Sequence, residues 1–344
     1  MNKKNIILHI GPHKTASTYI QNQIYKNENI LNKYNIIYPK VGFFGYGHHE
    51  LAQLFLDKKY KQIEILIKKI LNSENDNIIL SSEDFDKLDI EDVKKICYFF
   101  RYHNIKIVYV KRFTCEIMVS HWQEMIKHGN TYSWSEYFFE NINNPMNSRV
   151  INSCYVLDLY TNVFGKENIY IIDYNQAKRD NENIFKLFIE LISKINDFEY
   201  NDEKIINKSL DYLDVEIIRM LNYTHNGLVD LKCLNCAIDT SIYKAYMIIL
   251  TKDTQAIIKN IDFIKERIKK NMHQVDFKNS FIFNYLDDMF FDKYNSCVVN
   301  FRGDNSSYNK NLTFKLPLNN WIINEGVFEA LNELYEEVLK HIEK

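Results

Sequence analysis

The sequence contains short apolar runs, rich in Ile and Val, that are separated by longer segments with helical periodicity. Short apolar runs bounded by polar segments are typical of strands buried on both faces of a parallel sheet. Strands that alternate with helices along a chain predict an α/β fold. The predicted strands are Asn5–Ile10, Asn77–Leu80, Ile105–Val110 and Asn168–Ile172. The helices predicted between them are Ser17–Lys33, residues 63–71, Asp89–His103 and Thr114–His128.

Beyond residue 175 the strand signal fades and helical periodicity dominates. Further helices are expected at Ile184–Ile195, Asp211–Asn222, Thr240–Lys252 and Thr254–Met272. We therefore predict a three-layer α/β core with a central parallel sheet in residues 1–200. Residues 201–344 are predicted to form a mainly helical region that packs on this core and does not fold independently.

Composition argues against several classes of protein. Of the 344 residues, 46% are hydrophobic, and the formal net charge is −2. A balance this close to neutral is not that of a typical nucleic-acid-binding protein. No apolar segment approaches the roughly 20 residues that span a bilayer. The six cysteines include one C-x-x-C pair, Cys233 and Cys236, without the second pair of a structural zinc site. We expect free thiols in a cytoplasmic protein, with no metal site.

The first predicted strand runs into Gly11-Pro12-His13-Lys14-Thr15-Ala16-Ser17-Thr18, and a helix follows. A tight loop between a strand and a helix start is a common phosphate-binding arrangement, because backbone N–H groups and the helix dipole attract anions. Lys14 adds a positive charge, and the neighbouring hydroxyls add donors. A Walker A motif has four residues between its first Gly and the Gly-Lys pair, so this tighter loop fits a phosphosulfate better than a triphosphate with magnesium.

A second candidate anion site follows the third predicted strand. Lys111 and Arg112 end that strand, and Ser120 lies in the next predicted helix. An Arg offers a two-pronged set of donors and a Ser offers a neutral donor, so together they can bind one phosphate. The spacing is weak evidence alone, but the phosphate loop precedes it in the same predicted fold.

Together, G-x-x-K-T-x-S-T and V-x-V-K-R-x7-S resemble the two cofactor-binding signatures of the sulfotransferases that use 3′-phosphoadenosine 5′-phosphosulfate (PAPS). The chain is similar to bacterial carbohydrate-type members of this family over residues 5–225. Beyond the two signatures, the segments that are similar to these members are Tyr38-Pro39, residues 48–52, Ile79–Glu83, Gln123–Gly129, residues 163–168 and residues 207–210. Further on, Arg302-Gly303 resembles a pair that some members use near the 3′-phosphate.

The resemblance implies a P-loop-like core, PAPS as cofactor and adenosine 3′,5′-bisphosphate as product. It implies that Lys14 lies at the oxygen between phosphate and sulfate, and that Arg112 and Ser120 hold the 3′-phosphate. The 5′-phosphate would be held by Thr15, Ser17 and Thr18 within a cofactor loop that also includes Gly11, His13 and Ala16.

Sulfuryl transfer to a hydroxyl also needs a base. Glu83 follows the second predicted strand, and ligands collect at the carboxyl ends of parallel strands. Family members place a catalytic carboxylate or imidazole at the equivalent strand end, so we predict Glu83 as the base. His49 competes for this role, and His48 or His49 is expected to contact the acceptor.

The acceptor is predicted only by class, as a hydroxyl of a carbohydrate, lipid or small molecule, with a glycan or glycolipid preferred. Trp122 and Lys127 are candidate contacts on the helix that also carries Ser120. Aromatic residues are further candidates for a sugar-stacking or lipid pocket, and equally for the core: Phe43, Phe44, Tyr46, Tyr132 and Trp134.

Two other interpretations stay open. A P-loop kinase or nucleotide hydrolase would use ATP and magnesium, with Thr15 and a strand-end acid, Asp84 or Asp173, as ligands. A binding protein with a decayed site would be expected to lack some of the residues that are present here, among them Lys14 and Glu83.

Overall fold

The computed structural model describes residues 3–193, 200–201, 210–228, 239–251, 255–276, 280–299, 313–317 and 325–342. The chain divides into two compact units, each assembled from segments that are separate in the sequence. The first unit combines Met1–Ile117, Pro145–Ile206 and Tyr285–Tyr308, and the second combines Met118–Asn144, Asn207–Asn284 and Asn309–Lys344. Two of the boundaries fall within helices, α6 (Thr114–Lys127) and α14 (Phe281–Tyr294). The predicted division at residue 200 stays a prediction.

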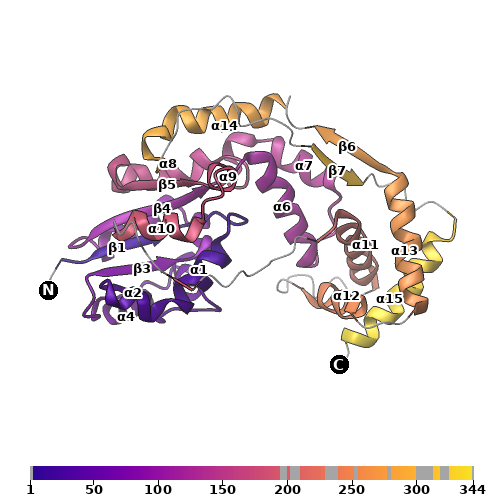
Figure 1. Ribbon diagram of the computed structural model, residues 1–344, viewed down its shortest axis with the longest axis horizontal. Helices are drawn as coiled ribbons and strands as arrows, with labels where there is room; N and C mark the ends of the chain where they lie inside the picture. Colours follow the sequence, from indigo (N-terminus) through magenta and orange to yellow (C-terminus); the bar gives the residue numbers. More distant parts are fainter. Residues whose placement is uncertain are drawn as a thin grey trace. The chain divides into compact units, whose positions relative to one another are not determined.

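A five-stranded parallel sheet with the order β2-β3-β1-β4-β5 forms the centre of the first unit (Figure 1). This confirms the predicted α/β fold class. The four predicted strands are present within one or two residues of their expected limits, and a two-residue strand, β2, joins them at the edge. The strands are β1 (Asn5–His9), β2 (Ile36–Ile37), β3 (Asn77–Ser81), β4 (Asn104–Lys111) and β5 (Ile169–Asp173).

The register of the sheet aligns the strand ends that carry the predicted site. In β1, His9 lies opposite Ser81 of β3 and Val108 of β4. The segments that follow β1 and β3 therefore leave the sheet side by side. Strand β4 continues to Lys111, so Arg112 leaves the sheet farther along on the other side of β1.

Helices cover both faces of this sheet. Alternate strand residues such as Ile7, Ile79 and Val108 belong to one buried cluster with apolar residues of α1 (Ser17–Lys26) and α10 (Ile184–Ser193). The opposite face is covered by α8 (Ser153–Phe164), which contacts β4 and β5 and packs against α5 (Ile90–Phe99). Since side chains of a strand alternate between faces, apolar runs of this kind need both layers.

The helix predicted over Ser17–Lys33 is two helices, α1 and α2 (Glu28–Lys33). The break is at Asn27, whose side-chain amide donates to the Gln23 carbonyl at 2.9 Å. Asn side chains compete with the backbone for such bonds and favour helix ends. The other helices of this unit are α3 (His49–Leu56), α4 (Tyr60–Leu71) and α9 (Tyr174–Arg179), with short 3₁₀ turns η1 (Glu83–Lys87), η2 (Pro145–Asn147), η3 (Lys166–Asn168) and η5 (Asn295–Cys297).

The second unit is mainly helical, as predicted for the C-terminal part. The predicted helix over Thr254–Met272 ends too late, because Met272 begins a strand of a small antiparallel pair in which Met272 lies opposite Pro317. The elements that complete this unit are α7 (Trp134–Ile142), α11 (Tyr212–Leu228), α12 (Ser241–Thr251), α13 (Gln255–Lys270), α15 (Val327–Ile342), β6 (Met272–Asp276) and β7 (Thr313–Pro317).

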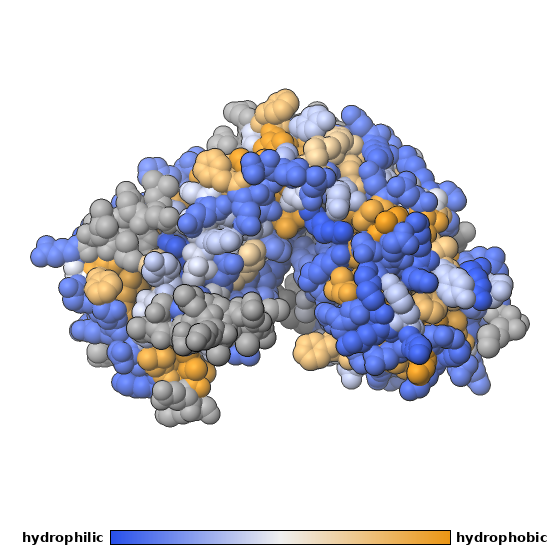
Figure 2. Space-filling model, turned by 180° about the vertical axis from the view of Figure 1, so that it is seen from behind, coloured by the Kyte–Doolittle hydropathy of each residue, from blue (hydrophilic) through white to orange (hydrophobic). Residues whose placement is uncertain are grey.

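Within the described residues, none of the helices has the length and apolar character needed to cross a bilayer. The face of the molecule in Figure 2 is mainly hydrophilic with small separate apolar groups, as expected when 26% of residues are charged. The Cys233–Cys236 pair, residues 207–209 and Arg302-Gly303 lie outside the described residues.

Candidate functional site

The backbone of the loop between β1 and α1 has features that favour anion binding. Gly11, Lys14 and Ala16 have φ values of 89°, 65° and 66°, in a region that residues other than glycine seldom adopt. Ala16 is the N-cap residue of α1, which has neither a side-chain cap nor an acidic residue in its first turn. The first N–H groups of a helix lack intrahelical partners and carry partial positive charge. Turns that contain residues in the left-handed conformation can also point successive backbone N–H groups into one concave site, which favours anions.

The side chains of this loop differ in their availability. Thr15 Oγ1 and Ser17 Oγ donate to the Pro12 carbonyl at 2.6 and 3.1 Å, and both residues are buried. Their hydroxyls therefore form hydrogen bonds within the loop and stabilise its conformation. Lys14 is half-buried and Thr18 is exposed. Of the four loop side chains predicted to bind the 5′-phosphosulfate, Lys14 and Thr18 reach solvent, whereas Thr15 and Ser17 maintain the shape of the loop.

Glu83 lies directly against this loop. A Cβ atom added to Gly11 would lie 3.0 Å from the Glu83 Cα atom, so the close approach requires glycine. From α1, Gln21 Nε2 donates to Glu83 Oε2 at 2.9 Å. The Glu83 side chain is 15% exposed. The predicted base is therefore oriented by α1 and lies beside the predicted cofactor loop.

His49 lies between two carboxylates. Its Nδ1 lies 3.0 Å from Asp84 Oδ2, and its Nε2 lies 3.8 Å from Glu83 Oε2. His13 Nε2, from the loop, lies 3.4 Å from the other Asp84 oxygen. Burial would lower the pKa of His49, but the Asp84 hydrogen bond and the charge of Glu83 outweigh burial and raise it.

Asp84 stays ionised in this cluster. Burial would raise the pKa of its carboxyl, but hydrogen bonds from His13, His49 and Lys87 lower it well below the usual range. Asp84 therefore pairs with both imidazoles, with His49 Nδ1 at 3.0 Å and with His13 Nε2 at 3.4 Å.

Arg112 connects the end of β4 to the loop. Its Nη1 donates to the Lys14 carbonyl at 2.8 Å, and its Nε donates to Glu116 Oε2 at 2.7 Å. The guanidinium carbon lies 5.0 Å from the centre of the Tyr174 ring. A guanidinium carries five N–H donors, so Arg112 can keep these contacts and also bind an anion.

The other predicted residues of α6 belong to the second unit. Ser120 is half-buried. Trp122 is fully buried, and its indole N–H donates to the Tyr132 carbonyl at 2.9 Å. Lys127 lies 3.3 Å from Glu124 Oε2. The sheet of the first unit therefore brings together the loop, Glu83, His49 and Arg112, while Trp122 contributes to the core of the second unit.

Two buried histidines lie beside the site. His9 Nδ1 is 2.8 Å from Ser81 Oγ, and the backbone N–H of Ser81 donates to His48 Nδ1 at 3.1 Å. Burial lowers the pKa of His9 to about 4 and that of His48 to about 3. Both imidazoles are therefore neutral near pH 7. The predicted contact between His48 and an acceptor has no exposed surface to use in this structure.

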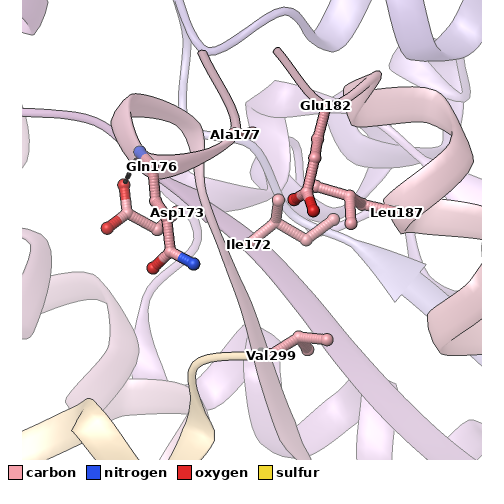
Figure 3. A pocket seen from close by; sticks show the side chains of 7 residues that line it. All are labelled: Ile172, Asp173, Gln176, Ala177, Glu182, Leu187 and Val299. Atoms are coloured by element: carbon pink, nitrogen blue, oxygen red, sulfur yellow. Dashed lines mark hydrogen bonds between the residues drawn. The ribbon is translucent and has the colours of Figure 1, made fainter. Parts of the chain in front are cut away.

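Cavities in the first unit also lie along β5. Figure 3 shows one of about 10 Å³, lined by Ile172, Asp173, Gln176, Ala177, Glu182, Leu187 and Val299. Its volume suits about one water molecule. Asp173 Oδ1 accepts the backbone N–H of Gln176 at 3.0 Å and caps α9. An open groove of about 580 Å³ lies near the other end of β5, beside Lys166 and Cys297.

Sequence reasoning missed Gln21 and the bridging position of His49 between two acids. Gln21 follows Ser17 by one helical turn, and that spacing was a usable signal, since residues four apart share a helix face. Comparisons of the sequence with protein-family models and with curated proteins gave no match. The chemistry of the site must therefore be derived from its own residues.

Proposed function

We propose that this protein transfers a sulfuryl group from PAPS to a hydroxyl group of an acceptor. The observation that carries the proposal is the meeting of three strand ends. Gly11 of the loop touches Glu83 after β3, and Arg112 after β4 donates to Lys14. The motifs that resemble the family signatures thus come from separate parts of the chain and surround one loop.

The residues fit a doubly phosphorylated nucleotide. Lys14, the start of α1 and Thr18 offer positive potential and donors for a 5′-phosphosulfate. Arg112 is oriented by Glu116 and offers further donors for a second phosphate. When bound, PAPS supplies an activated sulfuryl group. Lys14 would stabilise the charge that develops on the departing phosphate oxygen, an effect worth on the order of 100-fold in rate for one well-placed donor.

The Glu83 carboxylate is the proposed base. Gln21 and His49 orient it beside the loop. In the reaction, the acceptor oxygen bonds to sulfur, the bond between sulfur and the 5′-phosphate oxygen breaks, and the acceptor proton passes to Glu83. The raised pKa of His49 favours its protonated form relative to an ordinary histidine, which suits a partner of two carboxylates better than a base.

The magnesium-dependent alternative fits these residues less well. A kinase or nucleotide hydrolase of this type needs the hydroxyl after the loop lysine as a magnesium ligand. Thr15 is fully buried, and its hydroxyl donates to Pro12. Of the two candidate acids, Asp173 caps α9 and Asp84 binds histidines. A binding protein without activity would have no need to orient Glu83.

Titration calorimetry of the full chain tests the proposal. Adenosine 3′,5′-bisphosphate should bind at least about tenfold more tightly than AMP, because the second phosphate gains charge-assisted hydrogen bonds. Arg112→Ala should remove most of this difference. Arg101→Ala is the matched control, because Arg101 is exposed just before β4, at the opposite end of the sheet. Equal affinity for the two nucleotides, or tighter binding of ATP with magnesium, would contradict the proposal.

A further inference from the structure

Three aromatic side chains beside the proposed site are partly exposed to water and have no role in the proposed function. Phe44 is 78% exposed, Tyr46 is 43% exposed and Tyr25 is 38% exposed. The rings of Tyr25 and Tyr46 meet edge to face with their centres 5.2 Å apart. Apolar surface of this kind next to a site often marks a ligand contact. We call Tyr25, Phe44 and Tyr46 the aromatic platform.

The platform is held in place before any ligand binds. Phe44 and Gly47 form a tight turn in which each backbone N–H donates to the other residue's carbonyl, at 3.0 and 3.4 Å. The Tyr38 hydroxyl donates to the Tyr46 carbonyl at 2.8 Å. Tyr25 is fixed on α1. A rigid aromatic surface loses little conformational freedom on binding, so its contacts contribute more fully to affinity.

Two features place the platform beside the reacting groups. Tyr25 follows Gln21 by four residues on α1, so both residues share one helix face, about 6 Å apart along the axis. Gln21 is the residue that binds Glu83. The turn itself lies against the same groups, since a Cβ atom added to Gly47 would be 2.7 Å from His49 Nε2 and 2.9 Å from Gln21 Nε2. The platform therefore lies next to the side chains that hold Glu83 in place.

The polar surroundings of the platform indicate the kind of ligand. Lys40 Nζ lies 4.9 Å from the centre of the Tyr25 ring and 2.8 Å from Glu28 Oε2. The platform therefore combines the exposed rings of Phe44 and Tyr46 with a charged rim where Lys40 lies over Tyr25. A pyranose ring has an apolar C–H face and a rim of hydroxyl groups, and it matches both. An acyl chain or a small phenol would instead favour an enclosed apolar pocket, and the platform residues are open to solvent.

We infer that the aromatic platform is an acceptor subsite that binds a sugar ring, so that the acceptor is an oligosaccharide rather than a lipid or a phenol. This inference rests on the proposed function. The sugar on the platform neighbours the one whose hydroxyl oxygen bonds to sulfur and whose proton passes to Glu83. The platform takes no part in bond making, and it contributes affinity for the acceptor.

The test uses the full chain with adenosine 3′,5′-bisphosphate and neutral β-linked disaccharides, namely lactose, cellobiose, N-acetyllactosamine and chitobiose. Saturation-transfer NMR measures binding. Labelled PAPS measures transfer to the same sugars, to p-nitrophenol and to phosphatidylcholine vesicles that carry galactosylceramide. We expect binding and transfer with at least one disaccharide. Tyr46→Ala should raise its KM roughly 3- to 10-fold with little change in kcat, the effect of one lost ring contact.

Two control variants separate stacking from general damage. Tyr46→Phe keeps the ring and should retain the wild-type KM. Tyr102→Ala removes a ring that is 72% exposed near the start of β4, away from the loop, and it should change nothing. The inference is overturned if no disaccharide binds, if sulfuryl passes only to the phenol or the vesicle lipid, or if Tyr46→Ala behaves as wild type.

The two failures can be told apart. The protein could bind a disaccharide in a way that depends on Tyr46 and yet fail to bind adenosine 3′,5′-bisphosphate. That result would support the sugar-binding platform and contradict the proposed sulfotransferase activity. Nucleotide binding without disaccharide binding would reject the platform alone.

Discussion

Replacing Asp287 tests how the end of β4 is held in place. Asp287 lies on α14, and its Oδ1 accepts from Lys111 Nζ at 2.6 Å and from Thr114 Oγ1 at 2.6 Å. Both Asp287 oxygens also lie 3.3 Å from the backbone N–H of Thr114, the first residue of α6. Lys111 is 1% exposed and Asp287 is 4% exposed. One carboxylate therefore pairs with a buried cation and caps a helix, next to Arg112.

The expected loss of stability is large because the partner stays buried. Removing one member of a buried ion pair typically costs about 3–5 kcal/mol, since the other charge loses its compensation. Asp287→Ala should therefore lower the free energy of unfolding of the first unit by about that amount. Asp287→Asn keeps an acceptor for Thr114 and should cost less. Replacing both partners, Lys111→Met with Asp287→Leu, should restore much of the stability, because no uncompensated charge remains.

Urea denaturation followed by circular dichroism measures the effect, and hydrogen exchange of β4 amides assigns it to the first unit. Tryptophan fluorescence is less suitable, since Trp122 and Trp134 belong to the second unit. Glu64→Ala is the control, because it breaks an exposed pair with Lys68 on α4 and should change little. An unchanged midpoint for Asp287→Ala, or a double variant less stable than either single one, would refute the reasoning.

Further predictions concern the proposed site and its surroundings. Glu83→Gln should keep nucleotide affinity near wild type and lower turnover by roughly 10²–10⁴; if His49→Ala abolishes turnover while Glu83→Gln stays active, His49 is the base. Lys14→Ala should lower both cofactor affinity and turnover in calorimetry and rate measurements, and wild-type turnover should persist in EDTA. His9 is held neutral with a pKa of about 4, so it contributes full stability above its unfolded pKa of about 6.5. That contribution is lost as the pH falls towards 4. The free energies of unfolding measured by urea denaturation at pH 7 and pH 5 should therefore differ by about 2 kcal/mol more in wild type than in His9→Asn.

The local pattern of apolar residues was sufficient to predict the main strands of the first unit. Strands β1, β3, β4 and β5 were predicted within one or two residues, because short apolar runs are stable only when both faces are covered. The loop residues were found for the same reason, as they follow β1 directly. Strand β2 has only two residues, Ile36 and Ile37. That is too few to show a hydrophobic periodicity in the sequence, so the strand was not predicted. Met272 was assigned to a helix because its pairing with Pro317 leaves no mark in the local sequence.

The sequence by itself determined the α/β class, and it predicted the loop after β1, Glu83 and Arg112 as candidate site residues. Only the tertiary structure decided that Glu83 touches Gly11, that Gln21 binds Glu83, and that Lys111 pairs with Asp287 across 176 positions of the chain. Strand order makes the difference: β1 lies between β3 and β4, and such neighbours are chosen by long-range packing rather than by local propensity. Periodicity shows which face of an element is buried, whereas the partner on that face depends on the whole fold.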